Sequence, residues 1–293
     1  MKYNYTYIDI FAKIFSRKEA EFIRKTGMNQ EKFALLLGLI KAKIGEDKAE
    51  NEMRKRGLKS SVSLENQLLI ALYYLRDYMT HLKLGEHFGI SESYSCKIYI
   101  KMKKYMLRVL SLPKKTALKT MNLTQVIVDV SEQEIERPLK NQKDFYSGKQ
   151  KTHTMKALIF ICAVSLTILA VRTAKGTHHD FAMFKDCYKQ TAISFAETVE
   201  ILADSGFQGL KKYHDNCRTP FKATKNHPLT KEQKEFNQQL AKERIPIEHT
   251  NRKCKIFRIV KEPYRGKHKN FNQNWSLIAM LVNFSYDPFE CVA

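Results

Sequence analysis

The stretch QVIVDV, residues 125–130, decides the fold class of this 293-residue chain. Its β-branched apolar residues favour a short buried strand, and the apolar run ends around Asp129. In open α/β sheets, functional residues gather at the carboxyl ends of the strands. Asp129 is therefore the first candidate site residue.

The regions on the C-terminal side of this strand predict the rest of a sheet. Residues 152–163 and 166–173 form two strand-like runs, a helix begins near His179, and residues 200–203 form another strand. Thr230 and Gln233 have the spacing of a capping box for a polar helix, and a further helix carries Glu248. The order strand, hairpin, helix, strand, helix predicts an α/β domain with a mixed sheet.

The apolar residues 157–171 raise the alternative of a membrane span. A span needs about 20 apolar residues, and this run is shorter and contains Ser165 and Thr167. Neither end of the chain carries a recognisable signal peptide or lipidation motif. We expect two buried strands here and no membrane partner.

Three acidic residues form the candidate catalytic and metal site: Asp129, Asp204 at the end of the strand 200–203, and Glu248. Three carboxylates that converge resist joint ionisation unless cations neutralise them, and oxygen ligands without Cys or His favour magnesium or manganese. Two such ions about 3.5–4 Å apart are a recurrent device for phosphodiester chemistry. Each acid also has a structural interpretation, because aspartates favour turns and a glutamate is stabilised at a helix start.

The N-terminal part of the chain is predicted to be helical. Ser16 and Glu19 have the spacing of a helix start, Asn29 precedes a second helical pattern, and residues 64–78 form another helix. A short helix ending at Phe88, the turn Gly89-Ile90-Ser91 and a helix over 92–104 match a helix-turn-helix, although an ordinary helical hairpin is an alternative. The early part of the second helix supplies these candidates for DNA contact: Ser93, Tyr94, Ser95, Lys97 and Lys101.

The charge of the chain indicates a polyanionic partner. Lys and Arg number 51 against 30 Asp and Glu, which gives a formal charge of +21, the sign that phosphate backbones attract. A cationic surface without a partner and an anionic membrane surface are the alternatives. Eight basic residues lie between Arg252 and Lys269, and others, including Lys149 and Lys151, follow Asp129. The six cysteines contain no Cys-x-x-Cys pair, which favours reduced thiols in a cytoplasm.

Many separate motifs of the chain resemble one family. The chain is similar to bacterial insertion-sequence transposases of the DDE superfamily, in the group related to the eukaryotic Harbinger elements. The resemblance rests on Glu248 with Lys255 and on residues 63–69 (SLENQLL), 89–93 (GISES), 128–132 (VDVSE), 146–149 (YSGK), 179–181 (HDF), 203–209 (ADSGFQG) and 228–232 (PLTKE).

This resemblance implies a ribonuclease H-like domain with Asp129 on its first strand, Asp204 on its fourth and Glu248 on a following helix. It implies two Mg²⁺ or Mn²⁺ ions and cleavage and strand transfer at the terminal inverted repeats of the element. Because two element ends must be joined, we expect a homodimer on double-stranded DNA. Arg244 and Lys255 match accessory basic positions around the glutamate. The complete set of expected DNA contacts in the nuclease domain is Lys149, Lys151, Arg244, Arg252, Lys255 and Arg265.

The chain also departs from its relatives. Pro246 precedes Glu248 by two residues, where relatives usually lack proline, and we expect a new helix to begin there. The predicted domains are a helical region over 1–115, with the helix-turn-helix at about 60–108, and a ribonuclease H-like catalytic domain over 116–293. A sequence-specific DNA-binding protein without nuclease turnover is the alternative function, and a ribonuclease or repair nuclease is a third. We expect a cytoplasmic, nucleoid-associated protein.

Overall fold

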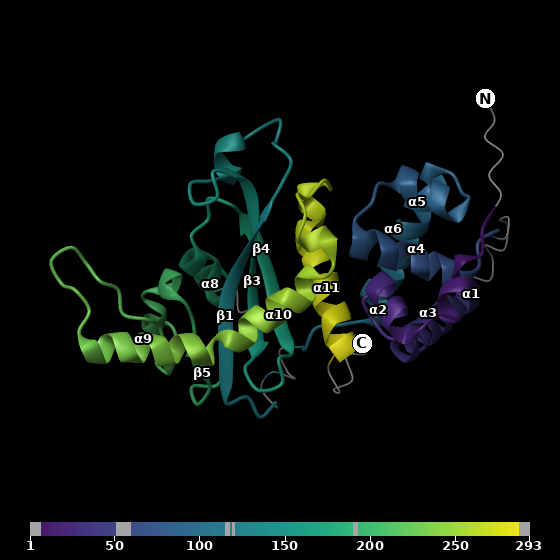
Figure 1. The fold of residues 1–293 in the computed structure, drawn as a ribbon. Helices are drawn as coiled ribbons and strands as arrows, with labels where there is room; N and C mark the ends of the chain where they lie inside the picture. Colours follow the sequence, from purple (N-terminus) through teal and green to yellow (C-terminus); the bar gives the residue numbers. More distant parts are fainter. Residues whose placement is uncertain (1–6, 51–59, 115–117, 119–120, 190–192, 287–293) are drawn as a thin grey trace. The chain divides into compact units, whose positions relative to one another are not determined.

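The computed structural model describes residues 7–50, 60–114, 118, 121–189 and 193–286. They divide into two compact units (Figure 1). The first contains the described residues of Met1–Ser111, Ile256–Ile259 and Phe284–Ala293, and the second contains those of Leu112–Lys255 and Val260–Asn283. The predicted domain boundary at residues 115 and 116 lies outside the described residues and stays a prediction.

The first unit is helical. It begins with α1 (Ile10–Phe15), α2 (Glu19–Thr26) and α3 (Gln30–Glu50). Asn29 accepts a hydrogen bond from the backbone N–H of Lys32 at 2.8 Å and so begins α3 as predicted. The prediction that Ser16 begins a helix is wrong: Ser16 ends α1, and its hydroxyl donates to the carbonyl of Lys13.

The next three helices form the predicted helix-turn-helix. They are α4 (Leu64–Asp77), α5 (His81–Phe88) and α6 (Glu92–Val109). The turn between α5 and α6 depends on two glycines: Gly89 has a φ of 63°, and a Cβ at Gly85 would lie 2.6 Å from the carbonyl oxygen of Ile90. Ser91 then caps α6 by accepting from the backbone N–H of Tyr94. The close approach of α5 to the start of α6 therefore requires a residue without a side chain at position 85.

The second unit is built on a mixed sheet (Figure 1). β1 pairs antiparallel with β3, β3 pairs antiparallel with β4, and β5 and β6 are parallel to β1 on its other edge. A short β2 adds to β3. This is the predicted ribonuclease H-like arrangement, and the expectation of an α/β mixed-sheet domain preceded by an all-α region is confirmed. The strands are β1 (Gln125–Glu134), β2 (Tyr146–Ser147), β3 (Thr152–Cys162), β4 (Ile168–Lys175), β5 (Glu200–Leu202) and β6 (Cys217–Arg218).

Helices cover both faces of this sheet. The longer ones are α8 (Asp180–Lys189), α9 (Lys231–Glu243), α10 (Ile245–Lys255) and α11 (Phe271–Tyr286). Single 3₁₀ turns lie at Gln142–Phe145, Ser205–Phe207, Leu210–Lys212, Arg258–Val260 and His268–Asn270. The capping box of Thr230 and Gln233 begins α9 as predicted.

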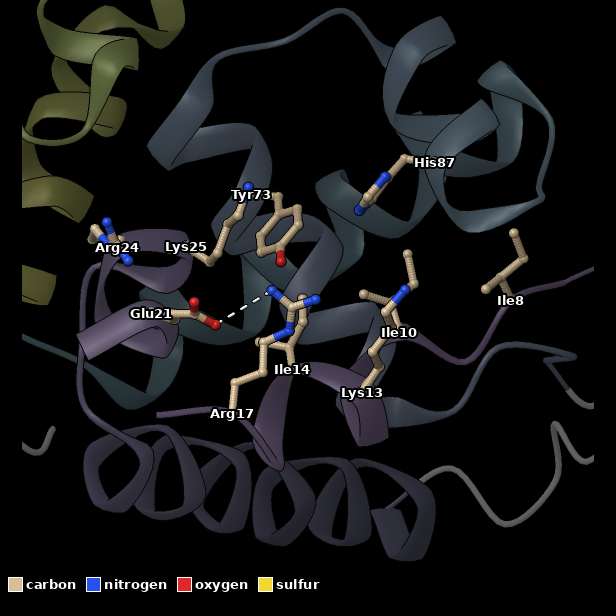
Figure 2. Close-up of a pocket in the computed structure, with 10 residues that line it drawn as sticks. All are labelled: Ile8, Ile10, Lys13, Ile14, Arg17, Glu21, Arg24, Lys25, Tyr73 and His87. Atoms are coloured by element: carbon tan, nitrogen blue, oxygen red, sulfur yellow. Dashed lines mark hydrogen bonds and ion pairs between the residues drawn. The ribbon is translucent and has the colours of Figure 1, made fainter. Parts of the chain in front are cut away.

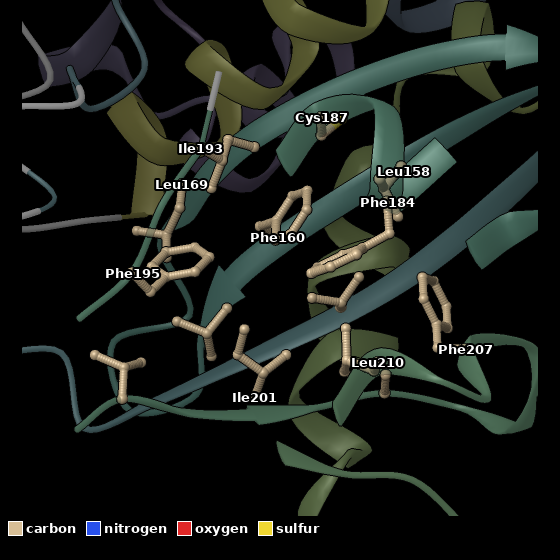
Figure 3. Close-up of a cluster of buried hydrophobic side chains, with 14 of the residues drawn as sticks. Leu158, Phe160, Leu169, Phe184, Cys187, Ile193, Phe195, Ile201, Phe207 and Leu210 are labelled. Atoms are coloured by element: carbon tan, nitrogen blue, oxygen red, sulfur yellow. The ribbon is translucent and has the colours of Figure 1, made fainter. Parts of the chain in front are cut away.

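Alternation along β1 sends successive side chains to opposite faces. Val126 and Val128 pack in an apolar core with Phe184 of α8 (Figure 3). On the other face, Asp129 accepts from Asn251 of α10, and Gln133 accepts from the indole N–H of Trp275 in α11. Because of this alternation, the side chain of Asp129 lies on the face of the sheet that α10 covers.

The apolar run 157–171 lies largely in β3 and β4 and is mostly buried within the sheet. This placement agrees with the expectation of two strands. Among the residues that the structure describes, no helix combines the length and the apolar character needed to cross a bilayer.

Candidate active site

Asp129 lies where β1 and β5 separate. β5 pairs with β1 only over Gln125–Ile127, whereas β3 continues to pair along the opposite edge as far as Glu134. Asp129 is therefore two residues beyond the last residue of β1 that β5 covers. Asp204 is two residues beyond the end of β5, so parallel pairing brings both aspartates toward the same crevice.

The carboxylate of Asp129 is largely buried and has two partners. Oδ1 lies 3.4 Å from Nη2 of Arg244, and Oδ2 accepts from Nδ2 of Asn251 at 3.1 Å. The pKa of Asp129 is raised to about 6, mainly by burial, and the charges of Asp204 and Glu248 contribute in the same direction. Arg244 opposes this rise but does not cancel it. Desolvation and the two neighbouring acids therefore outweigh the one cation.

Asp204 lies next to a fourth carboxylate, that of Asp180. Asp204 accepts from the backbone N–H of Gly206 at 2.8 Å. A Cβ at Gly206 would lie 3.0 Å from Oδ1 of Asp204 and 3.1 Å from Oδ2 of Asp180, so this glycine separates the two acids without filling the space between them. Asp180 also pairs with Lys156, whose ammonium lies 2.9 Å from Oδ1. Lys156 neutralises part of the charge that Asp180 adds.

Glu248 projects from the first turn of α10. α9 ends at Glu243 and α10 begins at Ile245, so the expected helix start at Pro246 is confirmed and Arg244 lies in the break between the helices. A network at the end of α9 supports this break: Arg218 of β6 donates to Glu200 and to Glu243. Arg244 reaches Asp129 from the junction and not from the helical face that carries Glu248.

A cavity of about 520 Å³ connects these residues. Asp129, Glu248 and Asp180 line it, whereas Asp204 is not among its lining residues and lies next to Asp180. The face of α10 that lines the cavity carries Glu248, Asn251 and Lys255, at three- and four-residue spacings. Arg252, one of the expected DNA contacts, does not line the cavity, and the sequence analysis missed Asn251. Its signal was available, because position 251 is one helical turn after Glu248.

The donor set fits a hard divalent cation in its chemistry. Asn251 and Ser131 are nine-tenths buried, and both Oδ1 of Asn251 and Oγ of Ser131 have no hydrogen-bond partner. Oxygen atoms of this kind, together with carboxylates, are ligands that Mg²⁺ and Mn²⁺ accept. Within the described part of the chain, however, no three His, Cys, Asp or Glu residues are grouped closely enough to hold an ion. The carboxylates converge but are not gathered into a finished ligand set.

The basic residues predicted for the nuclease domain fall into three groups. Lys149 and Lys255 line the cavity, and Arg244 is paired with Asp129. Lys151, Arg252 and Arg265 have exposed side chains and are not part of the cavity lining. The structure therefore brings three of the six predicted residues to the carboxylates.

Comparisons with known proteins agree with this arrangement. Residues 128–283 match the family described as DDE superfamily endonuclease, and residues 60–110 match the helix-turn-helix of DDE superfamily endonuclease. The chain is 36% identical over 268 residues to the probable transposase for insertion sequence element IS702 of Microchaete diplosiphon, covering 90% of this chain and 94% of that protein. The chain belongs to the DDE superfamily of transposases.

Two solved structures of a transposase also match this DDE transposase. The pre-cleavage Mos1 transpososome is 10% identical with a TM-score of 0.24, covering 80% of this chain and 83% of that chain. The Mos1 mariner paired end complex with Mn is 10% identical with a TM-score of 0.21, covering 96% of this chain and 97% of that chain.

In the helix-turn-helix of the transposase, only some of the predicted DNA-contact residues lie on the exposed face of α6. Ser93 and Lys97 are exposed, whereas Ser95 is fully buried and lies 3.3 Å from Nδ1 of His81. The expectation that Ser95 contacts DNA is therefore wrong, because its position one turn after Ser91 faces the other helices. The hydroxyl of Tyr94 is bonded to Ser60, and the ammonium of Lys101 donates to Gln67.

The outward stripe of α6 also contains two residues that the sequence reasoning missed. Ile100 is 59% exposed, and Lys104 follows it one turn later. Together with Ser93 and Lys97 they follow the spacing of one helical face. This exposed face therefore carries both basic and apolar side chains.

Proposed function

We propose that this transposase cleaves and transfers DNA strands at the terminal inverted repeats of its own insertion element. The observation that carries the proposal is Asp129, held where β1 and β5 separate and made difficult to ionise by burial and by Asp204 and Glu248. A buried acid with this environment needs a cation before it can be ionised at low free-energy cost. Such a centre in a strongly basic chain fits phosphodiester chemistry.

Two Mg²⁺ or Mn²⁺ ions would be held by Asp129, Asp204 and Glu248. When bound, a pair of such ions activates the attacking oxygen and stabilises the leaving oxygen of a phosphodiester. Nδ2 of Asn251 donates a hydrogen bond to Asp129 and so fixes the orientation of its carboxylate. Oδ1 of Asn251 has no hydrogen-bond partner. Arg244 neutralises part of the charge on Asp129 and can be released when ions replace it.

The basic residues of the cavity would bind the DNA backbone next to the acids. Lys255 lies two turns after Glu248 on the same helical face, and Lys149 lines the cavity from the loop after β2. Ammonium groups at these places can contact phosphates on either side of a reacting bond. Lys151, Arg252 and Arg265 would extend the contact outside the cavity.

The helix-turn-helix would recognise the element ends through α6. We expect Lys97→Ala to weaken DNA binding and to reduce the slope of log K against log salt by about 0.9, the amount for one lost phosphate contact. Lys18→Ala, which removes an exposed lysine that does not line a cavity, serves as the control. An unchanged slope in Lys97→Ala would exclude a phosphate contact at this position.

The proposal is tested by incubating the full chain with labelled duplex taken from the DNA that flanks its gene. We expect nicks at the inverted repeats with magnesium and none with chelator. Cleavage without preference for the repeats would instead indicate a general ribonuclease or repair nuclease on the same fold.

A DNA-binding protein without turnover is the second candidate. The ion pair of Arg244 with Asp129 favours it, because a carboxylate that is already paired has less need of a metal. This candidate predicts salt-sensitive binding of the inverted repeats with no magnesium-dependent nick. A homodimer would be needed to join two element ends. We also propose that the protein acts in a bacterial cytoplasm, associated with the nucleoid.

A further inference from the structure

A basic pocket in the helical unit lies apart from the predicted recognition helix. It has a volume of about 470 Å³ and is lined mainly by residues from the segment before α1, from α1 and from α2. Tyr73 of α4 and His87 of α5 complete it (Figure 2). The size lies within the range of about 300–1,000 Å³ that is usual for small-ligand sites.

The lining is strongly cationic. Lys13, Arg17, Arg24 and Lys25 line the pocket, and Glu21 is the single acid among the lining residues. Glu21 pairs with Arg17 at 3.3 Å, with both side chains close to half exposed. An exposed ion pair of this kind contributes little to stability, so Arg17 can exchange Glu21 for another anion at small cost.

The base of the pocket contains a hydrogen-bonding group without a partner. Tyr73 is 1% exposed, and its hydroxyl makes no hydrogen bond. Figure 2 shows this hydroxyl directed toward the guanidinium of Arg17. A buried hydroxyl without a partner destabilises a fold by about 1–3 kcal/mol. An anion that enters between the two groups would accept hydrogen bonds from both and remove this penalty.

Apolar residues form the remaining wall. Ile10 and Ile14 are buried, whereas Ile8 is half exposed. The backbone N–H of Ile8 donates to the carbonyl of Phe88 at 3.1 Å, which holds the segment before α1 against the end of α5. The ammonium of Lys25 lies over the aromatic ring of Tyr73, 5.9 Å from the ring centroid. The pocket thus combines donors for an anion with an apolar surface that could contact a sugar.

We infer that this pocket binds the phosphate of a nucleotide unit, with Arg17, Lys25 and Tyr73 as the donors. The ligand is either a backbone phosphate of bound DNA or a free nucleotide, and both present the same phosphate and sugar. The site adds a DNA contact outside α6 if the first source is correct. It does not depend on the acids of the nuclease domain, so its failure would leave the catalytic proposal untouched.

Two variants test the charged donors in the full chain. We expect Arg17→Gln and Lys25→Gln each to reduce the salt slope for binding a short duplex of arbitrary sequence by about 0.9. Lys18→Gln removes a neighbouring charge that does not line the pocket and should leave the slope unchanged. In a second arm, deoxyadenosine monophosphate and inorganic phosphate are tested for an increase in Tm of the wild type that both variants lose.

Tyr73→Phe tests the hydroxyl separately from folding. Because the hydroxyl has no partner in the free protein, its removal should leave Tm unchanged or raise it. Binding of whichever ligand gives a response should weaken about ten- to a hundredfold, the loss of one hydrogen bond to a charged group. A changed slope identifies backbone phosphate as the source, and a lost Tm increase identifies a free nucleotide. Wild-type slopes in both charge variants, with no Tm increase from either small ligand, would overturn the inference.

Discussion

Asp129→Asn is expected to reduce magnesium-dependent nicking of element-end DNA by about a thousandfold or more. The substitution keeps the shape of the side chain but removes the charge that two divalent ions would need. Metal coordination at a reacting phosphate is worth several kcal/mol, and about 4 kcal/mol corresponds to a factor of a thousand in rate. Single-turnover cleavage of end-labelled duplex with saturating protein measures the chemical step.

Two further variants and one control extend this expectation. Asp204→Asn and Glu248→Gln should show losses of the same order, because all three carboxylates would serve the same ions. Asp215→Asn, an exposed aspartate of the same unit, should cut normally. DNA affinity should be retained in every variant. Normal cutting by any one of the three would remove that residue from the proposed site.

The stability of the protein should also depend on Asp129 in a way that pH and magnesium change. The pKa of Asp129 in the folded protein is about 6, above its ordinary value of 3.8, so the folded state favours the protonated acid. The resulting penalty is absent below pH 4, grows as the pH rises to about 6, and is constant above that. Two pKa units correspond to about 3 kcal/mol. In chelator, Asp129→Asn should therefore be more stable than the wild type at pH 8 by up to about 3 kcal/mol, and equally stable near pH 4.

Magnesium should cancel most of this difference. Ions that bind the folded wild type would raise its free energy of unfolding, by about 2.7 kcal/mol at a hundred times the dissociation constant. Asp129→Asn should gain much less, and Asp215→Asn should behave as the wild type. Urea unfolding at pH 8 with magnesium and with chelator measures both effects without any DNA. Equal magnesium stabilisation of Asp129→Asn and the wild type would show that the ions do not use this carboxylate.

Local sequence signals determined most of the elements because they act over a few residues. The β-branched run at 125–130 predicted the first strand, and the Thr230–Gln233 box and Pro246 marked where α9 and α10 begin. Ser91 and the glycine after Phe88 marked the turn before α6. Such signals failed where two interpretations compete locally. Ser16, for example, has the spacing of a helix start, but its hydroxyl donates a hydrogen bond to the carbonyl of Lys13 in the preceding helix.

The candidate site was predicted as three separate acids, without any distance between them. Asn251 was missed although it lies one helical turn after Glu248, because helical spacing alone does not show which side chain contacts Asp129. Its importance comes from its contact with Asp129, 122 positions earlier in the chain. Ser95 was assigned to the wrong side of α6, because the rotation of a helix depends on which neighbours bury it.

By itself, the sequence determined the family and the type of most elements, and it named three acids as candidates, because strand propensity, capping and motif spacing are properties of short segments. The tertiary structure decided which groups come together: Asn251 instead of Arg252 in the cavity lining, Asp180 beside Asp204, and Arg244 paired with Asp129. These pairings depend on where β1 and β5 separate and on how α10 lies over the sheet. Both are set by packing between residues far apart in the chain, which local sequence patterns do not encode.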